Sequence, residues 1–446
     1  MSDSAQQARI GKFLKQVKRE VILDDNTAYK LLGVKWYGKG AFIREEKTGK
    51  SIKAKKLYQV KTGDFIYNRL FAWKSSFAII GEEFDGCLVS NEFPVFVYNS
   101  KDINIKYLLD YILLPTNIDY VNRMSKGVSG VSRNRFKEKI FLDMKLPELS
   151  IQQQNKISSK TNQYRASIEK IDCEITRQQT LLKKLRQSIL QDAISGKLTE
   201  KWRKENPDVE PASELLKRIK AEKDRLIKEN KIKKQDSLPP IKKEEIPFEL
   251  PKRWEWCHLG DYALFERGKF SIRPRNDPSC FGGDYPFIQI GSLDNTGSVV
   301  STFNQTLNEK GFAASKLFEQ GTVMVAIVGG TIGNLGVLGK DMCFPDSMVG
   351  VRPNQLTSQD YILMLLQHYQ PSVRELAYQM AGQPNIKLPT LNNLVCALPP
   401  LTEQKVLVDK VEKLLALGEL LESQITKSQQ DVESLMQAVL KEAFEG

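Results

Sequence analysis

The most regular pattern of apolar and polar positions is a seven-residue repeat, which occurs in two long stretches of the chain. In the first stretch, one apolar series steps by seven from Thr161 and another from Ile157. In the second stretch, the corresponding series begin at Val411 and Leu407. Such heptads predict two helices, each with an apolar seam of the coiled-coil type. We expect the seams to include Ile168, Ile175, Leu182, Ile189, Leu414, Leu421, Ile425 and Val432.

The segments that enter and leave the two helices are repeated as well. Residues 146–152, Leu-Pro-Glu-Leu-Ser-Ile-Gln, return as residues 398–404, Leu-Pro-Pro-Leu-Thr-Glu-Gln. Both helices end in Leu-x-Gln-x-x-Leu-x-x-Ala-x-x-Gly, and glycine suits a helix C-terminal cap. Two copies at so long a period indicate a duplicated domain with its helix, because stacked repeats have much shorter periods.

A globular region precedes each helix. Alternating strand-like runs with turns, followed by a helical stretch, occur first in residues 1–145 and again in residues 251–397. We therefore predict an α/β (α+β) chain with two globular domains separated by two long antiparallel coiled-coil helices in a pseudo-twofold arrangement, since a returning linker lets equivalent helices bury both seams. The expected boundaries are 1–145 for the first globule, 146–199 for the first helix, 200–250 for a charged linker with one helix, 251–397 for the second globule and 398–446 for the second helix.

Composition narrows the possible partners and the location. The formal net charge of +12 favours a polyanionic partner. Six scattered cysteines and two histidines give no metal-ligand spacing, so we expect no metal site. The sequence has neither a signal-like start nor a run of 18 apolar residues, and we expect a cytoplasmic protein without membrane contact.

The motifs of nucleic-acid enzymes are missing. The glycine-rich run of residues 329–336 lacks the lysine of a phosphate-binding loop, and a turn at the end of a strand explains it. The sequence contains no Asn/Asp-Pro-Pro-Tyr/Phe loop of an adenine methyltransferase. Pro345-Asp346 is not followed by the Asp/Glu-x-Lys of a nuclease. We therefore expect no catalysis by this chain.

The repeated architecture resembles the specificity (S) subunit of type I restriction-modification enzymes. The resemblance rests on the two globules, on the repeated Leu-Pro-x-Leu-x-x-Gln motif and on residues 196–203, Gly-Lys-Leu-Thr-Glu-Lys-Trp-Arg. The opening Trp254-x-Trp256 and residues 285–288, Tyr-Pro-Phe-Ile, look like that family's target recognition domains. The first globule departs from the pattern because it opens with residues 9–13 and has no Trp-x-Trp.

The resemblance implies a function in DNA recognition. Each globule would be a target recognition domain that reads one half of a split target in double-stranded DNA, while the helices set the spacing. Two methyltransferase (M) subunits with S-adenosylmethionine would bind around the helices, and restriction (R) subunits would use ATP and Mg. The resemblance implies no cofactor in this chain, and a bacterial or archaeal host that defends itself against phage.

Candidate DNA contacts are polar and basic residues near turns. Gly130 and Gly382 lie equally far before Leu146 and Leu398, which makes the loops that leave the two globules equivalent. These exit loops offer Ser129, Arg133, Asn134 and Arg135 in the first globule, and Gln383, Asn385 and Lys387 in the second. Basic and aromatic clusters add Lys35, Tyr37, Lys39, Arg69, Lys74, Arg267, Lys269, Arg273 and Arg275. A solvated surface is the competing interpretation for each, and we expect Trp36 and Trp73 in the core.

Two other classes of function stay open. The chain could belong to a related restriction enzyme with a fused methylase-nuclease, an interpretation that S-adenosylmethionine binding by the isolated chain would favour. Alternatively, the globules could bind proteins on a coiled-coil scaffold. A complex without any DNA sequence preference would favour this alternative.

Overall fold

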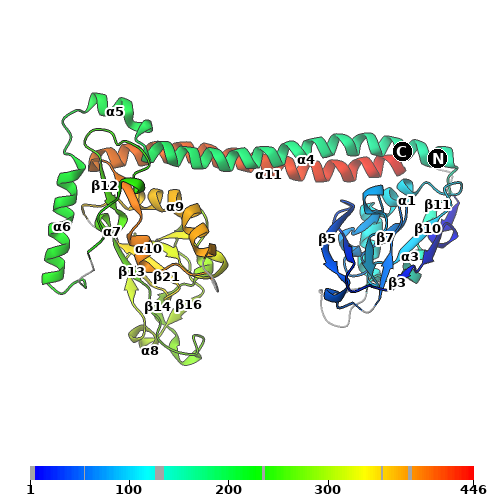
Figure 1. Cartoon of the computed structure of the whole chain (residues 1–446), viewed down its shortest axis with the longest axis horizontal. Coiled ribbons are helices and arrows are strands. Elements are labelled where there is room, and N and C mark those ends of the chain that lie inside the picture. The colour runs from blue at the N-terminus through cyan, green and yellow to red at the C-terminus, as the bar shows by residue number, and fades with distance from the viewer. Residues whose placement is uncertain are drawn as a thin grey trace. The chain divides into compact units, whose positions relative to one another are not determined.

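The computed structural model describes residues 6–54, 56–125, 135–233, 237–352, 355–379 and 384–445. The chain divides into two compact units (Figure 1). Unit 1 comprises Met1–Gln178 with Gln424–Gly446, and unit 2 comprises Gln179–Ser423. The predicted α/β class, with two globules and two long helices, is confirmed. Because the units divide both helices between them, the domain boundaries drawn from the sequence stay a prediction.

Globule 1, which lies within residues 6–147 of unit 1, contains two main sheets. Its four-stranded sheet has the order β2-β10-β7-β8 and its five-stranded sheet the order β3-β6-β9-β4-β5. The strands are β2 (Leu14–Val17), β3 (Glu20–Val21), β4 (Ala28–Val34), β5 (Ala41–Thr48), β6 (Leu57–Gln59), β7 (Phe65–Tyr67), β8 (Phe77–Ile79), β9 (Leu88–Ser90) and β10 (Val95–Tyr98). The helices are α1 (Ile105–Ile112), α2 (Pro115–Met124) and α3 (Glu138–Asp143).

Globule 2, which lies within residues 254–398 of unit 2, also has two main sheets. Their orders are β13-β21-β18-β19-β15 and β16-β14-β20-β17. The strands are β13 (Leu264–Arg267), β14 (Phe281–Phe287), β15 (Val299–Val300), β16 (Gln305–Leu307), β17 (Leu317–Phe318), β18 (Val323–Ala326), β19 (Leu335–Leu338), β20 (Met342–Cys343) and β21 (Met348–Arg352). The helices are α7 (Leu259–Tyr262), α8 (Glu309–Ala313), α9 (Gln359–Gln379) and α10 (Leu388–Asn392).

The two globules share one topology. The order β2-β10-β7-β8 corresponds to β13-β21-β18-β19, and β6-β9-β4-β5 corresponds to β17-β20-β14-β16. Even the parallel pair recurs, as β4 with β9 in globule 1 and β14 with β20 in globule 2. Strand β3 is found in globule 1 alone and β15 in globule 2 alone. The duplication inferred from the helices therefore extends through both sheets.

A short two-stranded sheet forms the neck of each globule. The entering strand β1 (Gln7–Arg9) pairs with the leaving strand β11 (Lys145–Pro147), and β12 (Glu255–His258) pairs likewise with β22 (Val395–Leu398). A buried tyrosine hydroxyl donates to a carbonyl of each leaving strand, from Tyr107 to Pro147 and from Tyr361 to Ala397. Both necks are thus fixed in the same way.

A buried glutamine marks the start of each long helix. The amide of Gln154 donates to the carbonyl of Leu149, and the amide of Gln404 donates to that of Pro399. Gln404 therefore corresponds to Gln154, whereas alignment of the repeated motif had paired it with Gln152. The motif alignment is displaced by two residues, because the tyrosine bonds pair Ala397 with Pro147, so that Leu398 corresponds to Glu148 and not to Leu146.

The long helices α4 (Ile151–Ile194) and α11 (Leu401–Glu445) run antiparallel within each unit. In unit 1 the Lys160 ammonium pairs with the Glu442 carboxylate at 2.7 Å, and Ile168 and Ile175 pack with Val432. In unit 2 the Lys410 ammonium donates to the carbonyl of Leu198, at the C-terminal end of α4. These contacts hold the helix pair together in both units.

The seam between the helices is narrower than the heptads predict. Ile168, Ile175, Ile189 and Val432 are buried, whereas Leu182 and Ile425 are half-buried. Leu414 and Leu421 were expected in the seam, but their side chains are 37 % and 47 % exposed. Each helix has two apolar series, and its partner helix covers only one of them. Leu414 and Leu421 belong to the uncovered series of α11.

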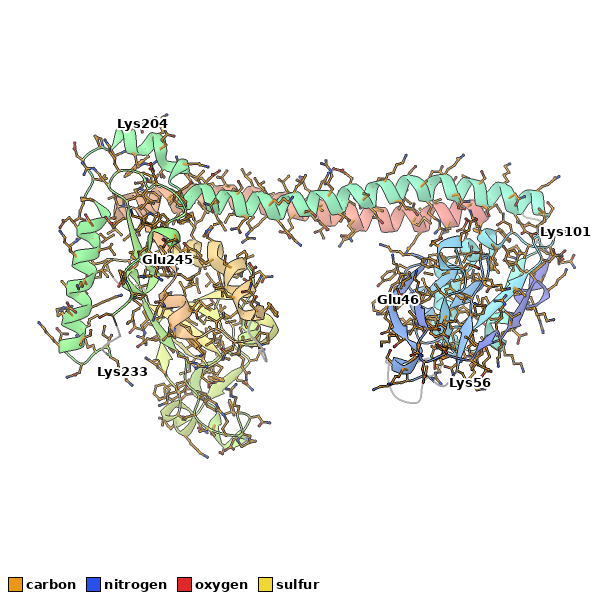
Figure 2. The ribbon with its side chains drawn as sticks, viewed as in Figure 1. Glu46, Lys56, Lys101, Lys204, Lys233 and Glu245 are labelled. Carbon is orange, nitrogen blue, oxygen red and sulfur yellow. The ribbon has the colours of Figure 1, made fainter. Side chains whose placement is uncertain are left out.

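The segment between α4 and globule 2 packs on its own unit. It contains α5 (Glu200–Glu205) and α6 (Ala212–Lys228), and Leu215 and Ile219 of α6 are fully buried in the core of unit 2. The Lys223 ammonium donates to the carbonyls of Gly260, Asp261 and Ala263, which close α7. Other lysines of the segment, such as Lys204 on α5, lie on the surface (Figure 2). Among the described residues, none of the helices has an apolar stretch long enough to cross a membrane.

Candidate nucleic-acid interface

Three strands of globule 2 bring the predicted contacts to one sheet edge. In the antiparallel registers, Arg267 at the end of β13 lies opposite Val349, and Ala326 at the end of β18 lies opposite Met348. The segments just beyond these pairs therefore share an edge. The exit loop joins them there, because Asn385 forms a β-bridge with Val328.

Asp346 organises the basic residues at this edge. Its carboxylate accepts from Arg275 at 2.6 Å and lies 3.5 Å from the Arg273 guanidinium, while its carbonyl accepts from Arg267 at 2.7 Å. Lys269 is exposed nearby and is held through a backbone bond to the carbonyl of Phe344. One carboxylate shared by two exposed guanidinium groups orients them and leaves excess positive charge for phosphates.

The second exit loop exposes Asn385 and Lys387. Hydrogen bonds from Ile386 N–H to the carbonyl of Ile327, and from Gly329 N–H to that of Pro384, fix the loop on β18. Asn385 lies between the two bonded residues of the loop and is exposed. Lys387 is exposed as well and is the N-cap residue of α10. Gln383 lies outside the described residues. Two polar side chains on a backbone tied to a sheet meet the geometric requirement for reading base edges.

The first exit loop meets globule 1 in the same way. Phe136 N–H donates to the carbonyl of Arg69, as Ile386 N–H does to that of Ile327, and Lys137 is the N-cap residue of α3. Arg135 and Lys137 therefore correspond to Asn385 and Lys387. The sequence alignment had paired Arg135 with Lys387 instead, and it passed over Lys137. Ser129, Arg133 and Asn134 lie outside the described residues.

The arginines of globule 1 are more strongly paired than expected of free DNA contacts. Arg69 is largely buried and forms an ion pair with Glu138, and the more exposed Arg135 pairs with Glu92. A backbone bond from Arg69 N–H to the carbonyl of Glu92 links the two pairs. Arg69 thus supports the exit loop, while the exposed Arg135 is the better placed to meet a phosphate.

The other candidates of globule 1 surround the turn between β4 and β5. Lys35, Tyr37 and Lys39 line an open groove of about 540 Å³, together with Trp36. The Lys74 ammonium lies 3.6 Å from the centre of the Trp36 ring, a cation–π contact that fixes both groups. Trp36 was expected in the core, but its side chain is 42 % exposed because it sits on a turn outside both sheets. Trp73 is half-buried, and its indole N–H donates to the carbonyl of Leu70.

The motif that suggested the family has a structural basis in unit 2. Glu403 of α11 is fully buried, and its carboxylate accepts from Arg203 at 2.6 Å and from the Trp254 indole at 2.8 Å. Arg203 ends the run of residues 196–203, which begins at Gly196 with φ of +74°. An added Cβ at Gly196 would meet Pro251 at 2.7 Å, so this turn requires glycine. The ion pair and hydrogen bond of Glu403 therefore join α11 to the linker, through Arg203, and to the neck of globule 2, through Trp254.

The described residues offer no group of three or more His, Cys, Asp or Glu that could hold a metal ion. The glycine-rich run forms the turn between β18 and β19, as the sequence suggested. Burial raises the pKa of Asp294, but hydrogen bonds from Ser298 and Thr296 and from the Gly297 N–H outweigh it and lower the value to about 2. This carboxylate is therefore an ionised loop anchor, and ionised carboxylates at turns commonly have that purpose.

The family comparison agrees with this geometry. Residues 251–428 match the family model of the type I restriction modification DNA specificity domain. The resemblance of the chain to type I specificity subunits is thereby confirmed.

Individual relatives cover different parts of the chain. It is 58 % identical to the type I restriction enzyme EcoAI specificity subunit of Escherichia coli over 84 residues, 19 % of this chain and 14 % of that protein. It is 24 % identical to the EcoKI specificity subunit of Escherichia coli strain K12 over 340 residues, 73 % of this chain and 62 % of that protein. In both alignments the chain spans less than two thirds of the relative's length.

The fold is similar to that of a chain in a solved structure of a type I restriction-modification system. The TM-score is 0.63 at 16 % identity, and the alignment covers 100 % of this chain and 98 % of the other. At this level of identity, the similarity concerns the fold.

Proposed function

We propose that this chain is the DNA-reading subunit of a type I restriction-modification complex, and that each globule reads one half of a split target. The observation that carries the proposal is the duplicated site. In both globules the exit loop is bonded to the same strand edge, and exposed polar or basic residues project beside it. Two equivalent readers suit a target with two separated specific segments.

The long helices would hold the two readers at a fixed separation. At 1.5 Å per residue, a 44-residue helix such as α4 is roughly 66 Å long. The paired helices are continuous through the polar positions Gln178 and Ser428, and a continuous helix transmits distance as a flexible linker does not. We infer from this that the separation of the half-sites depends on helix length.

The uncovered face of the helices would dock two methyltransferase subunits. Apolar side chains at heptad spacing remain exposed on both helices: Tyr164, Ile171, Leu185, Leu414, Leu421 and Leu435. An apolar stripe of this kind marks a surface that a partner covers. Catalysis, S-adenosylmethionine, ATP and Mg would belong to methyltransferase and restriction partners, in the cytoplasm of the host.

The decisive experiment maps adenine methylation across a genome that expresses the chain with its methyltransferase. We expect a split motif with two specific segments and a fixed non-specific spacer. A continuous motif would contradict the proposal, and absence of any sequence preference would favour a protein-binding scaffold. Binding of S-adenosylmethionine by the isolated chain would favour the related enzyme with a fused methylase-nuclease.

The separating role of the helices can be tested by an insertion beside Gln178, with a matched insertion beside Ser428 to preserve pairing. Four added residues lengthen each helix by about 6 Å. We expect the bases of each half-site to stay the same while the spacer lengthens. A changed base preference within a half-site would show that the helices contribute to reading.

A further inference from the structure

The turn between β4 and β5 presents two large aromatic side chains to solvent. Tyr37 is 69 % exposed and its neighbour Trp36 is 42 % exposed. Their rings meet edge to face, with centroids 6.5 Å apart. Buried aromatic surface is a major source of binding energy, so two exposed rings side by side on one turn indicate a contact surface.

The backbone of this turn is held in a conformation that tyrosine seldom adopts. Tyr37 has φ of +57°, and Ser75 on the neighbouring turn has φ of +59°. Two hydrogen bonds of 2.8 Å join the turns, from Tyr37 N–H to the carbonyl of Lys74 and from Gly38 N–H to that of Ser75. Glycine would fit the backbone at position 37 without strain. A strained aromatic residue kept rigid by its surroundings is a mark of a functional position.

The charge in the groove that Trp36 and Tyr37 share is complementary to DNA, because basic and no acidic side chains line it. Neither Lys35 nor Lys74 takes part in an ion pair among the described residues, and Lys39 has only a 3.9 Å contact with Asp172 of α4. Phe71 supports the Trp36 ring from within the globule, at a centroid distance of 5.6 Å. The aromatic rings are thus supported from within the globule, and the Lys35 and Lys74 ammonium groups beside them have no carboxylate partner among the described residues. Such groups bind backbone phosphates while a ring contacts bases.

We propose that Tyr37 stacks on a nucleobase of double-stranded DNA and locally unstacks the half-site that globule 1 reads. Trp36 supports the tyrosine, and Lys35 and Lys74 hold the adjoining phosphates. Side chains that insert at a base step deform the duplex, and deformation cost differs among sequences. The turn therefore adds a preference for easily unstacked steps to the contacts of the exit loop. This inference rests on the proposed function of the chain.

Globule 2 does not repeat this device. The corresponding connection there, residues 288–304, is longer and adds β15 to the first sheet. Among its described residues, all of them in this case, positive φ angles are confined to glycine. The effect is therefore confined to one half of the target, and the other half serves as an internal control.

The test uses the full chain in complex with its methyltransferase, and duplexes that carry the split motif found by methylation mapping. 2-Aminopurine, whose fluorescence rises on unstacking, replaces one base at a time in both halves, and the methylated adenines are left unsubstituted. We expect a rise of several-fold at one step in one half. Tyr37→Gly should abolish the rise without harming the fold, because glycine suits the backbone there. Tyr37→Phe should retain it.

A control variant separates stacking from general loss of binding. Tyr378→Ala removes a similarly exposed tyrosine, 59 % accessible, from α9 of globule 2 and should leave the signal unchanged. If the motif is bound but fluorescence does not rise, or if the rise persists in Tyr37→Gly, stacking by Tyr37 is refuted while the proposed function stands. If the complex does not prefer the motif over an unrelated duplex, both are refuted.

Discussion

Globules 1 and 2 have the same strand order but differ in the connection between two corresponding strands, β4 to β5 and β14 to β16. In globule 1 the residues 35–40 make a tight turn with exposed aromatic rings, whereas in globule 2 the residues 288–304 form an extended insertion anchored by Asp294. The basic residues differ too, since Arg69 pairs with Glu138 while Arg273 and Arg275 share Asp346. The scaffold is thus repeated and the proposed reading surface is not, as the proposal of two readers with different target sequences requires.

The two necks differ in how the start of the long helix is held. Position 403 of α11 corresponds to position 153 of α4. Glu403 is fully buried and accepts from Arg203 and Trp254, whereas Gln153 is exposed and accepts a hydrogen bond from the Ser150 N–H at the helix start. The start of the long helix is therefore held by a buried carboxylate in unit 2 and by an exposed amide in unit 1. In unit 1, Phe444 of α11 also packs against Tyr107, with ring centroids 5.3 Å apart.

The largest effect should come from removing the buried carboxylate. We expect Glu403→Ala to lower the free energy of unfolding of unit 2 by about 3 kcal/mol, because it leaves Arg203 and the Trp254 indole without their acceptor. Gln153→Ala should cost about 1 kcal/mol, the value of a helix cap. Calorimetry of the full chain would measure both. Equal losses would show that the two necks are secured alike.

The second effect concerns the exit loops. Replacing Asn385 and Lys387 with Ala should weaken recognition of one half-site by roughly 1 to 3 kcal/mol per lost base contact. The corresponding pair, Arg135 and Lys137, should affect the other half-site. Selection of preferred half-sites from randomised duplexes, with complex assembly checked by size, would measure this. An identical loss at both half-sites from one pair of substitutions would refute independent reading.

Substitutions on the uncovered helix face provide the contrast to those in the loops. Leu414→Asp with Leu421→Asp should reduce methyltransferase assembly, and so weaken recognition of both half-sites together, with little loss of stability because both side chains are exposed. Assembly can be followed by sedimentation. Normal assembly of this variant would remove the support that the exposed series gives to docking.

A smaller effect should be common to both necks. Tyr107→Phe and Tyr361→Phe each remove the hydroxyl that satisfies a carbonyl of the leaving strand. We expect each to cost about 1 to 2 kcal/mol, the value of a buried acceptor left unpaired. Matching losses in the two units, measured by denaturant unfolding, would support their equivalence. A loss confined to one unit would show that the two units are equivalent in topology but not in this interaction.

The last effect appears only below neutral pH and is peculiar to unit 2, which holds both histidines of the chain. Burial lowers the pKa of His368 to about 4, whereas an unfolded histidine has a pKa near 6.5. The folded state therefore binds this proton less well. Its contribution to stability is complete above about pH 6.5 and is lost as pH falls toward 4. His368→Gln should reduce the pH dependence of the melting temperature of unit 2 over this range. An unchanged slope would exclude His368 as its source.

Local patterns predicted more of the molecule than long-range ones did. The heptads located α4 and α11 closely, because helical periodicity is a property of neighbouring residues. They did not reveal that Leu414 and Leu421 face outward, since an apolar series shows only that a surface needs covering. Trp36 was misplaced for a related reason, as hydrophobicity alone does not separate a core ring from a contact ring.

The site was predicted in part. The exit loops were found from their spacing, but the correspondence of Lys137 with Lys387 was missed, because the Leu-Pro motif recurs at an offset of 252 residues whereas equivalent positions recur at 250. A better signal was available. The heptad series that begin at Thr161 and Val411 lie 250 residues apart, and the same offset pairs Lys137 with Lys387. The arginine network around Asp346 could not have been predicted, because it depends on how β13 and β21 are paired.

The pairing of the entering and leaving strands in each neck has a consequence for how the gene can recombine. In each neck the entering and leaving strands are hydrogen-bonded neighbours, so both ends of a globule lie side by side. An inserted domain whose ends are adjacent can be replaced without altering the rest of its host chain. Recombination at gene segments that encode β12 and β22 would exchange one globule and leave both helices intact. If each globule reads one half-site as proposed, new specificities arise by exchange of whole globules, a far shorter route than mutating one contact at a time.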